Sequence, residues 1–292
     1  MDQALNTGIP FVKMHGCGND FVIIDRRRHA VEITPEMAQE IGDRQRGVGF
    51  DQLITIDEDP TGQLAADIIF WNADGSISGA CGNGTRCVAS LLLEESGKDA
   101  LTLRTERGLL VCRRVEGGLY SVDMLEPRLE WEQIPLAERM DTHIVDIKLG
   151  PIDNPTLHSP GAVNMGNPHC VFFVERLKDH KVETIGPFVE NHFLFPERAN
   201  IGFAEVRSRD AIRLKVWERG VGMTLACGSG ACAAVVAGVR KNLLDRAVTV
   251  TVDGGELSIE WREGDDHVIM TGPVHKSFDG VLPAELFVGA SA

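Results

Sequence analysis

The chain has 292 residues, of which 43% are hydrophobic and 25% charged, with a formal net charge of −14 at pH 7. This composition is typical of a globular protein, and the length suffices for one large core or two smaller ones. The acidic balance argues against nucleic acid as a partner, because phosphate recognition needs clustered lysine and arginine. No apolar run approaches the roughly 18–20 residues that span a bilayer, and the N-terminus lacks the features of a signal peptide. We therefore expect a cytoplasmic protein without a membrane partner.

The first half of the chain predicts strands around one main helix. Apolar runs broken by glycine indicate two strands joined by a turn, and Thr34-Pro35-Glu36 has the capping hydroxyl and early proline of a helix start. That helix should end by Gly47. A denser apolar segment then predicts a largely buried helix that stops near Gly97. The expected strands are 11–14, 21–24, 101–105, 109–113 and 120–124, and the buried helix includes 88–94.

The second half predicts a helix over 231–244, rich in alanine and valine, followed by strands at 248–252, 257–261 and 268–270. It also repeats landmarks of the first half. Cys81-Gly82-Asn83-Gly84 reappears as Cys227-Gly228-Ser229-Gly230, an offset of 227 − 81 = 146 residues. The same offset relates Trp71 to Trp217, Met124 to Met270 and Pro127 to Pro273. Slightly different offsets relate Gly18-Asn19-Asp20 to Gly166-Asn167-Pro168, and Val48-Gly49-Phe50 to Ile201-Gly202-Phe203. The chain therefore reads as two copies of one unit.

The repeated motif suggests chemistry at the start of two buried helices. The first turn of a helix has unpaired N–H groups and partial positive charge, and glycine lets an anion approach them closely. A thiol placed there is expected to have a lowered pKa. Two such helices from related lobes would bring Cys81 and Cys227 to opposite faces of one carbon. One thiolate would remove a proton while the other thiol returns one, as stereoinversion requires.

Five other cysteines lack this setting, and there is no CxxC pair and no zinc-like ligand spacing. Cys87 and Cys232 fall inside the two predicted helices, and Cys112 and Cys170 in predicted strands. Core packing is the better interpretation for these four. Cys17 lies in a glycine-rich loop near Asn19 and receives no assigned role.

The motifs resemble those of the diaminopimelate epimerase family, in the same order and over nearly the whole chain. The strings that carry the resemblance are Met14-His15-Gly16-Cys17-Gly18-Asn19-Asp20-Phe21, Gly47-Val48-Gly49-Phe50-Asp51-Gln52, Asn72-Ala73-Asp74-Gly75-Ser76, Ala80-Cys81-Gly82-Asn83-Gly84-Thr85-Arg86-Cys87, Met165-Gly166-Asn167-Pro168-His169, Pro196-Glu197-Arg198-Ala199-Asn200-Ile201-Gly202-Phe203, Glu218-Arg219-Gly220 and Ala226-Cys227-Gly228-Ser229-Gly230.

The resemblance implies interconversion of LL- and meso-diaminopimelate in lysine and peptidoglycan precursor synthesis, without pyridoxal phosphate, metal or other cofactor. It implies an α+β fold of two pseudo-symmetric lobes, each a mostly antiparallel sheet wrapped around a central helix, with the active site in the cleft between them. We expect an N-terminal lobe of residues 1–126, joined by a C-terminal strand 275–292, and a C-terminal lobe of 127–274. A homodimer is also implied, although Phe278 stands where some members have a tyrosine at the dimer contact, and Met223 stands where a glutamate is common.

Carried over by position, Cys81 and Cys227 are the acid/base pair, and His169 and Glu218 tune their pKa values. The carboxylate at the reacting carbon would be held by Gly82, Asn83, Gly228 and Ser229. The rest of the substrate pocket would be lined by Asn19, Gln52, Asn72, Asn167, Asn200, Glu218 and Arg219. Amides can both donate and accept, and arginine can hold a carboxylate with two hydrogen bonds, which suits a substrate with two amino-acid ends.

Three alternatives remain open. A proline racemase or hydroxyproline epimerase would share the cysteine pair but would present a smaller pocket; Arg219 and the loops of Asn167 and Asn200 favour the longer substrate. A thiol-redox or metal-binding protein would use more of the cysteines, and the wide separation of Cys81 from Cys227 argues against it. A non-catalytic amino-acid binding protein would keep its function after either cysteine was replaced.

Overall fold

The computed structural model describes residues 8–79 and 81–287. The chain divides into two compact units: unit 1 contains residues up to Val122 together with the segment from Pro273 onward, and unit 2 is Asp123–Gly272. The lobe boundaries expected from the sequence stay a prediction, and the part of the expected strand 275–292 beyond Phe287 lies outside the described residues. Within the described ranges, no helix is long and apolar enough to span a membrane.

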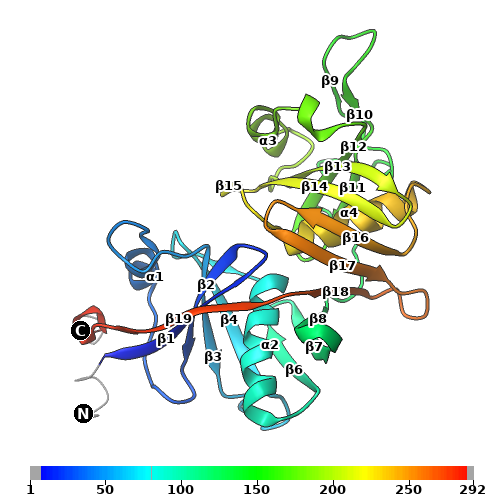
Figure 1. The fold of residues 1–292 in the computed structure, drawn as a ribbon. Coiled ribbons are helices and arrows are strands. Elements are labelled where there is room, and N and C mark those ends of the chain that lie inside the picture. Colours follow the sequence, from blue (N-terminus) through cyan, green and yellow to red (C-terminus); the bar gives the residue numbers. More distant parts are fainter. Residues whose placement is uncertain (1–7, 80, 288–292) are drawn as a thin grey trace. The chain divides into compact units, whose positions relative to one another are not determined.

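Unit 1 is a mixed sheet with one long helix, α2, packed against it (Figure 1). The strands run in the order β19-β1-β2-β3-β4-β6-β7-β8, and all neighbours are antiparallel except β2–β3 and β4–β6, which are parallel. Its strands are β1 (Ile9–Gly16), β2 (Asn19–Asp25), β3 (Gln52–Asp57), β4 (Ala66–Asn72), β5 (Ile77–Ser78), β6 (Ala100–Thr105), β7 (Gly108–Val115), β8 (Leu119–Asp123) and β19 (His275–Leu282). Its helices are α1 (Pro35–Gly42) and α2 (Gly82–Ser96), with short 3-10 turns η2 (Glu116–Gly118) and η4 (Ala284–Phe287).

Unit 2 repeats the strand topology of β1 to β8 in unit 1. Its strands run in the order β11-β12-β13-β14-β16-β17-β18, with β12–β13 and β14–β16 parallel and the other neighbours antiparallel. The strands are β9 (Lys148–Leu149), β10 (Leu157–His158), β11 (Gly161–Asn164), β12 (Pro168–Val174), β13 (Asn200–Ser208), β14 (Ala211–Glu218), β15 (Gly222–Met223), β16 (Ala247–Val252), β17 (Gly255–Trp261) and β18 (Val268–Gly272). The helices are α3 (Val182–Glu190), the 3-10 turn η3 (Leu177–Asp179) and α4 (Gly228–Arg240), which packs on this sheet as α2 packs on the other (Figure 1).

The strand registers align the two copies of the repeat residue by residue. In the parallel pair of unit 1 Phe21 lies opposite Gln52, and in unit 2 His169 lies opposite Asn200. Both positions are offset by 148 residues (169 − 21 and 200 − 52). Gln52 therefore corresponds to Asn200, and the match expected between Val48-Gly49-Phe50 and Ile201-Gly202-Phe203 is wrong, because only the latter lies within a strand. The α+β class and the sheet-and-helix organisation of each unit are confirmed.

The helix ends follow local rules. Thr34 Oγ1 accepts from the Met37 N–H at 3.3 Å, and α2 ends at Gly97 with a left-handed φ of 66°. The expected end of the other main helix at residue 244 is wrong, since α4 ends at Arg240. Asn242 has a φ of 58°, and the Leu243 N–H donates back to the Gly238 carbonyl at 2.9 Å. This closing turn satisfies the last carbonyls and stops the helix.

Gly84 shows why the second glycine of the repeated motif is needed. A Cβ at this position would lie 2.7 Å from Ile54 Cδ1 and 3.0 Å from Phe70 Cε1, both buried side chains of the sheet. The glycine therefore lets α2 approach the sheet closely, a packing role that the sequence did not predict.

We expect Gly84→Ala to destabilise the protein by about 1–3 kcal/mol, the usual cost of overpacking a core. Thermal or urea unfolding of the purified variant would measure this. Gly97→Ala is a poor control because of its positive φ, whereas Ser96→Ala, at the exposed end of α2, should change stability far less. An unfolding midpoint for Gly84→Ala equal to that of the wild type would contradict the close helix–sheet contact.

Candidate active site

Cys81 is the N-cap residue of α2 in unit 1. Its extended backbone (φ −147°, ψ 104°) turns the chain into the helix, and its carbonyl accepts from the Thr85 N–H at 2.8 Å. The sulfur accepts from the Gly84 N–H at 3.4 Å. Gly82 and Asn83 form the first turn and are buried, while Cys81 is only partly buried. The thiol thus lies at the partially positive end of a buried helix, where a thiolate is favoured.

Asn19, at the start of β2, lies beside this thiol. Its Oδ1 accepts from Cys81 Sγ at 3.8 Å and from Asn83 Nδ2 at 3.2 Å. Asn19 is 8% exposed and Asn83 is 1% exposed, so this group is largely shielded from water. Asn19 therefore contacts two predicted site residues that lie more than 60 positions further along the chain, within one unit.

Gln52 and Asn72 form a second polar pair on neighbouring strands of unit 1. They face each other in the β3–β4 register, and Gln52 Nε2 donates to Asn72 Oδ1 at 2.9 Å. Asn72 Nδ2 donates to Ser76 Oγ at 3.0 Å across the turn that follows β4. Asn72 therefore has the turn role that is common for asparagine and also holds another predicted site residue.

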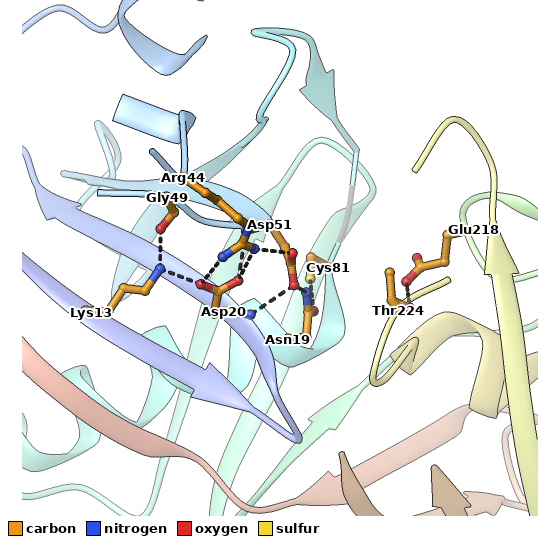
Figure 2. A network of polar contacts seen from close by, with 9 residues as sticks. All are labelled: Lys13, Asn19, Asp20, Arg44, Gly49, Asp51, Cys81, Glu218 and Thr224. Carbon is orange, nitrogen blue, oxygen red and sulfur yellow. Dashed lines mark hydrogen bonds and ion pairs between the residues drawn. The ribbon is translucent and has the colours of Figure 1, made fainter. Parts of the chain in front are cut away.

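Cys227 is the N-cap residue of α4 in unit 2, but its sulfur has a different partner. Cys227 Sγ donates to Glu218 Oε2 at 3.1 Å, and Thr224 Oγ1 donates to Glu218 Oε1. Glu218 ends β14, and Thr224 lies on the loop that leads to the helix (Figure 2). Cys227 is 4% exposed. A carboxylate fixed by a hydroxyl therefore faces a buried thiol.

His169 completes this half of the site through Ser229. His169 Nε2 lies 3.1 Å from Ser229 Oγ and 2.9 Å from Asn167 Oδ1, and Ser229 Oγ lies 3.6 Å from Cys227 Sγ. His169 is buried on β12, at 1% exposure. Four predicted site residues are therefore connected by hydrogen bonds, with the histidine reaching the sulfur by way of a hydroxyl.

Asn200 and Arg219 lie next to each other in unit 2. Asn200 Oδ1 accepts from the Arg219 backbone N–H at 2.9 Å, and its Nδ2 donates to the Pro168 carbonyl at 3.0 Å. Arg219 Nη1 donates to the Glu197 carbonyl at 2.8 Å, which holds the guanidinium near the turn between β14 and β15. The side-chain oxygen of Asn200 thus binds this turn, and its nitrogen binds the start of β12.

The expectation that a thiol at each helix N-terminus has a lowered pKa is wrong for Cys227. Burial raises the pKa of Cys227 well above its ordinary value, and the charge of Glu218 and its hydrogen bond raise it further. Ser229 and the Gly230 N–H act in the opposite direction but do not compensate. Desolvation and a nearby negative charge both penalise a thiolate, and here they outweigh the helix terminus. Cys227 is therefore a thiol at neutral pH.

The two halves differ at corresponding positions, and the difference gives the two thiols opposite electrostatic surroundings. With the offset of the helices, Glu218 corresponds to Asn72 (218 − 146) and Cys232 to Arg86 (232 − 146). Arg86 is fully buried in α2, one turn beyond Cys81, and its charge favours ionisation of the neighbouring Cys17 and Cys87 thiols. Unit 1 thus carries a buried positive charge near its N-cap cysteine, and unit 2 carries a negative one.

The four cysteines expected to pack in the cores, Cys87, Cys112, Cys170 and Cys232, are buried, and so is Cys17. Burial raises the pKa of Cys87 to about 12 and also raises that of Cys170. No group of three or more His, Cys, Asp or Glu residues placed to bind a metal occurs among residues 8–79 and 81–287.

Two further residues hold predicted site residues in place and were not predicted from the sequence. Thr224 binds Glu218, and Asp51 accepts from Asn19 Nδ2 at 2.7 Å. Asp51 belongs to one of the motifs that resemble the family and directly precedes Gln52. These two facts are the only sequence signals that pointed toward Asp51. Its contact with a residue 32 positions away depends on the parallel pairing of β2 with β3.

The family model and the similar sequences agree on one family. The family model described as diaminopimelate epimerase matches residues 11–129 and 161–277. A diaminopimelate epimerase of Caulobacter vibrioides is 52% identical over 279 residues, covering 94% of this chain and 97% of the relative. One from Acidiphilium cryptum is 53% identical over 277 residues, covering 95% and 97%. Among solved structures, a hydroxyproline epimerase from Agrobacterium vitis with bound trans-4-hydroxy-L-proline is 14% identical, with a TM-score of 0.67 and coverage of 96% and 94%. That last likeness concerns the fold alone.

Proposed function

Because the chain belongs to the diaminopimelate epimerase family and is therefore an isomerase, we propose that it interconverts LL- and meso-diaminopimelate with two cysteines. The observation that carries the mechanism is the pair of helix N-cap cysteines at corresponding positions of the repeated unit. Cys81 and Cys227 act on opposite faces of the α-carbon. The chemistry needs no cofactor in this proposal, and it serves lysine and peptidoglycan precursor synthesis in the cytoplasm.

The different surroundings of the two cysteines support opposite resting protonation states. Cys227, facing Glu218 in a buried setting, starts as the proton donor. Cys81 starts as the thiolate, which the Gly84 N–H and the buried charge of Arg86 favour. For one stereoisomer Cys81 removes the α-proton while Cys227 delivers its own to the other face. For the other stereoisomer the roles reverse: Cys227, left as the thiolate by a forward turnover, removes the α-proton, and the protonated Cys81 delivers its own to the other face.

Loss of the α-proton places negative charge on the substrate carboxylate, and the two helix termini are suited to hold it. We assign this carboxylate to the first-turn groups of Gly82, Asn83, Gly228 and Ser229. N–H groups that are already oriented stabilise developing charge without reorganisation. The support is the burial of Gly82, Asn83 and Gly228 at the helix starts and the hydroxyl of Ser229 next to the thiol.

The remaining predicted residues are assigned to substrate recognition. Asn19, Gln52, Asn72, Asn167 and Asn200 supply neutral donors and acceptors, and Glu218 and Arg219 bind the charged groups of the amino-acid ends. Hydrogen bonds already hold most of these side chains in place, which lowers the entropic cost of binding. His169 tunes Cys227 through Ser229.

A homodimer is also part of the proposal. Phe278 on β19 is 50% exposed and packs edge-on against Phe11, with 6.0 Å between the ring centroids. An exposed aromatic on a strand is a suitable contact for a second copy. Sedimentation of the purified protein would test this assignment.

The function is tested by following isotope uptake from deuterated water during turnover of each stereoisomer, with L-proline assayed alongside. We expect diaminopimelate to be epimerised and the product to be labelled much faster than the remaining substrate early in the reaction. Each face has its own proton carrier, so the product gains a solvent-derived proton. Turnover of proline alone would instead favour a proline racemase, and equal labelling of substrate and product would contradict the two-base mechanism.

A further inference from the structure

Asp51 is joined to the thiol of Cys81 by a single intervening side chain. Asn19 Nδ2 donates to Asp51 Oδ2 at 2.7 Å, and the other end of the same amide, Oδ1, faces Cys81 Sγ at 3.8 Å (Figure 2). A carboxylate can only accept hydrogen bonds. The amide nitrogen of Asn19 must therefore point toward Asp51, and its carbonyl oxygen must point toward the thiol.

The carboxylate that sets this orientation is itself held on several sides. Arg44 Nη2 donates to Asp51 Oδ1 at 2.7 Å, and the Asp20 backbone N–H donates to Asp51 Oδ2 at 3.1 Å. The Asp51 backbone N–H in turn donates to the Asp20 carbonyl at 2.9 Å. Two hydrogen bonds and a charge-assisted bond from arginine leave the side chain little freedom.

Asp20 fixes the surrounding loop from the other side. It accepts from Lys13 Nζ at 2.5 Å and from Arg44 Nη2 at 2.7 Å, and Lys13 also donates to the Gly49 carbonyl (Figure 2). Burial opposes ionisation of Asp20, but the bonds from Arg44 and Lys13 outweigh it and hold its pKa below the ordinary value. The Asp20 side chain accepts from the Asp51 N–H, whereas the Asn19 amide donates to Asp51, which makes Asp20 a natural control.

We propose that Asp51 is a positioning residue that locks the Asn19 amide with its carbonyl oxygen toward Cys81. In this orientation the amide oxygen accepts a hydrogen bond from the thiol. Within the proposed function, this gives Cys81 a partner in both protonation states. The thiolate accepts from the Gly84 N–H, and the thiol formed after proton abstraction donates to Asn19. The lock prevents the amide from turning its NH2 group toward the sulfur, which would hold the thiolate and weaken it as a base.

The second unit has no equivalent of the Asp51–Asn19 contact. The register offset places Ala199 at the position of Asp51 (199 − 51 = 148), and the matching Asn167 instead binds His169. There the thiol has a direct acceptor in Glu218. Among the described residues, the charged and titratable groups around the first thiol include Lys13, Asp20, Arg44 and Asp51 of the network, Arg86 and Cys87 of α2, and Cys17 of the β1–β2 turn.

An exchange of the two side chains tests the lock. Asp51→Asn should keep kcat/KM within about threefold, since an amide oxygen can still accept from Asn19. Asn19→Asp should lose about 10–100-fold, because two carboxylates then face each other. The double variant N19D/D51N restores one donor and one acceptor and should recover to within about tenfold of the wild type.

The matched control is N19D/D20N, which removes the same charge from the network but supplies no donor to the side chain at position 19. It should stay as impaired as Asn19→Asp, and thermal unfolding should show all variants to be folded. Equal recovery in both double variants, or no recovery in the exchange, would overturn the proposal.

A second measurement does not depend on the substrate. Alkylation of Cys81 by iodoacetamide is followed against pH by peptide mass spectrometry. In Asp51→Ala its pH profile should shift to lower pH by about one unit, which makes the reaction about tenfold faster at pH values below the pKa of Cys81, because the released amide can donate to the sulfur. Asp20→Ala should not shift it. An unchanged profile in Asp51→Ala would overturn the lock, whereas a wild-type protein inactive on diaminopimelate would overturn the proposed function instead.

Discussion

Replacing either Cys81 or Cys227 with alanine should lower kcat for epimerisation by at least about 10²–10⁴-fold, the usual contribution of a general acid or base. Inversion needs one proton carrier on each face of the α-carbon, and each variant lacks one. The measurement is the rate of LL to meso conversion by chiral chromatography. A non-catalytic binding protein would behave differently, because it would still bind diaminopimelate normally after either change and would show no wild-type turnover.

Each variant should still catalyse exchange of the α-proton, and the two variants should do so for opposite stereoisomers. The remaining cysteine can remove and return a proton on its own face, so one isomer should exchange its α-proton with deuterated water without inversion. Cys87→Ala and Cys232→Ala are the matched controls, since they remove thiols from inside α2 and α4 and should leave kcat nearly unchanged. Exchange of the same isomer by both alanine variants would contradict the assignment to opposite faces.

Glu218→Gln should lower kcat/KM by about 10–100-fold near neutral pH and should change the shape of the pH profile. The carboxylate faces the Cys227 sulfur at 3.1 Å and accepts its hydrogen bond, which holds Cys227 as the thiol. An amide in its place can still form a hydrogen bond, but it carries no charge to keep the thiol protonated. The reaction direction in which Cys227 must start as the proton donor should therefore lose the most.

The sign of the pH effect follows from the causes that raise the pKa of Cys227. Burial and Glu218 raise the pKa of Cys227, so the thiol form is present at low and neutral pH and is lost as pH rises through that pKa. Without the charge of Glu218 the pKa of Cys227 falls, so the alkaline limb of the profile should move to lower pH. Glu197→Gln, an exposed position with the same charge change, should leave the limb in place. An alkaline limb that stayed fixed in Glu218→Gln would show that another group sets it.

Much of the fold was accessible from the sequence because it depends on local rules and on repetition. Glycine-broken apolar runs located β1 and β2, and Thr34-Pro35 marked the start of α1. The duplicated Cys-Gly-x-Gly motif, together with the family resemblance, pointed to two related units and to both N-cap cysteines. Smaller features escaped: the end of α4 depended on the left-handed conformation of Asn242, and the role of Gly84 depended on how closely the helix approaches the sheet.

The sequence by itself determined the helices and strands around the two repeated motifs, the duplicated unit, the family and the residue types that the chemistry needs. Only the tertiary structure decided the protonation of Cys227 and the orientation of the Asn19 amide. Both depend on distances between groups on different elements: Glu218 at the end of β14 against the start of α4, and Asp51 before β3 against the start of β2. Exclusion of water and nearby charge set a pKa, and neither is encoded in spacing along the chain.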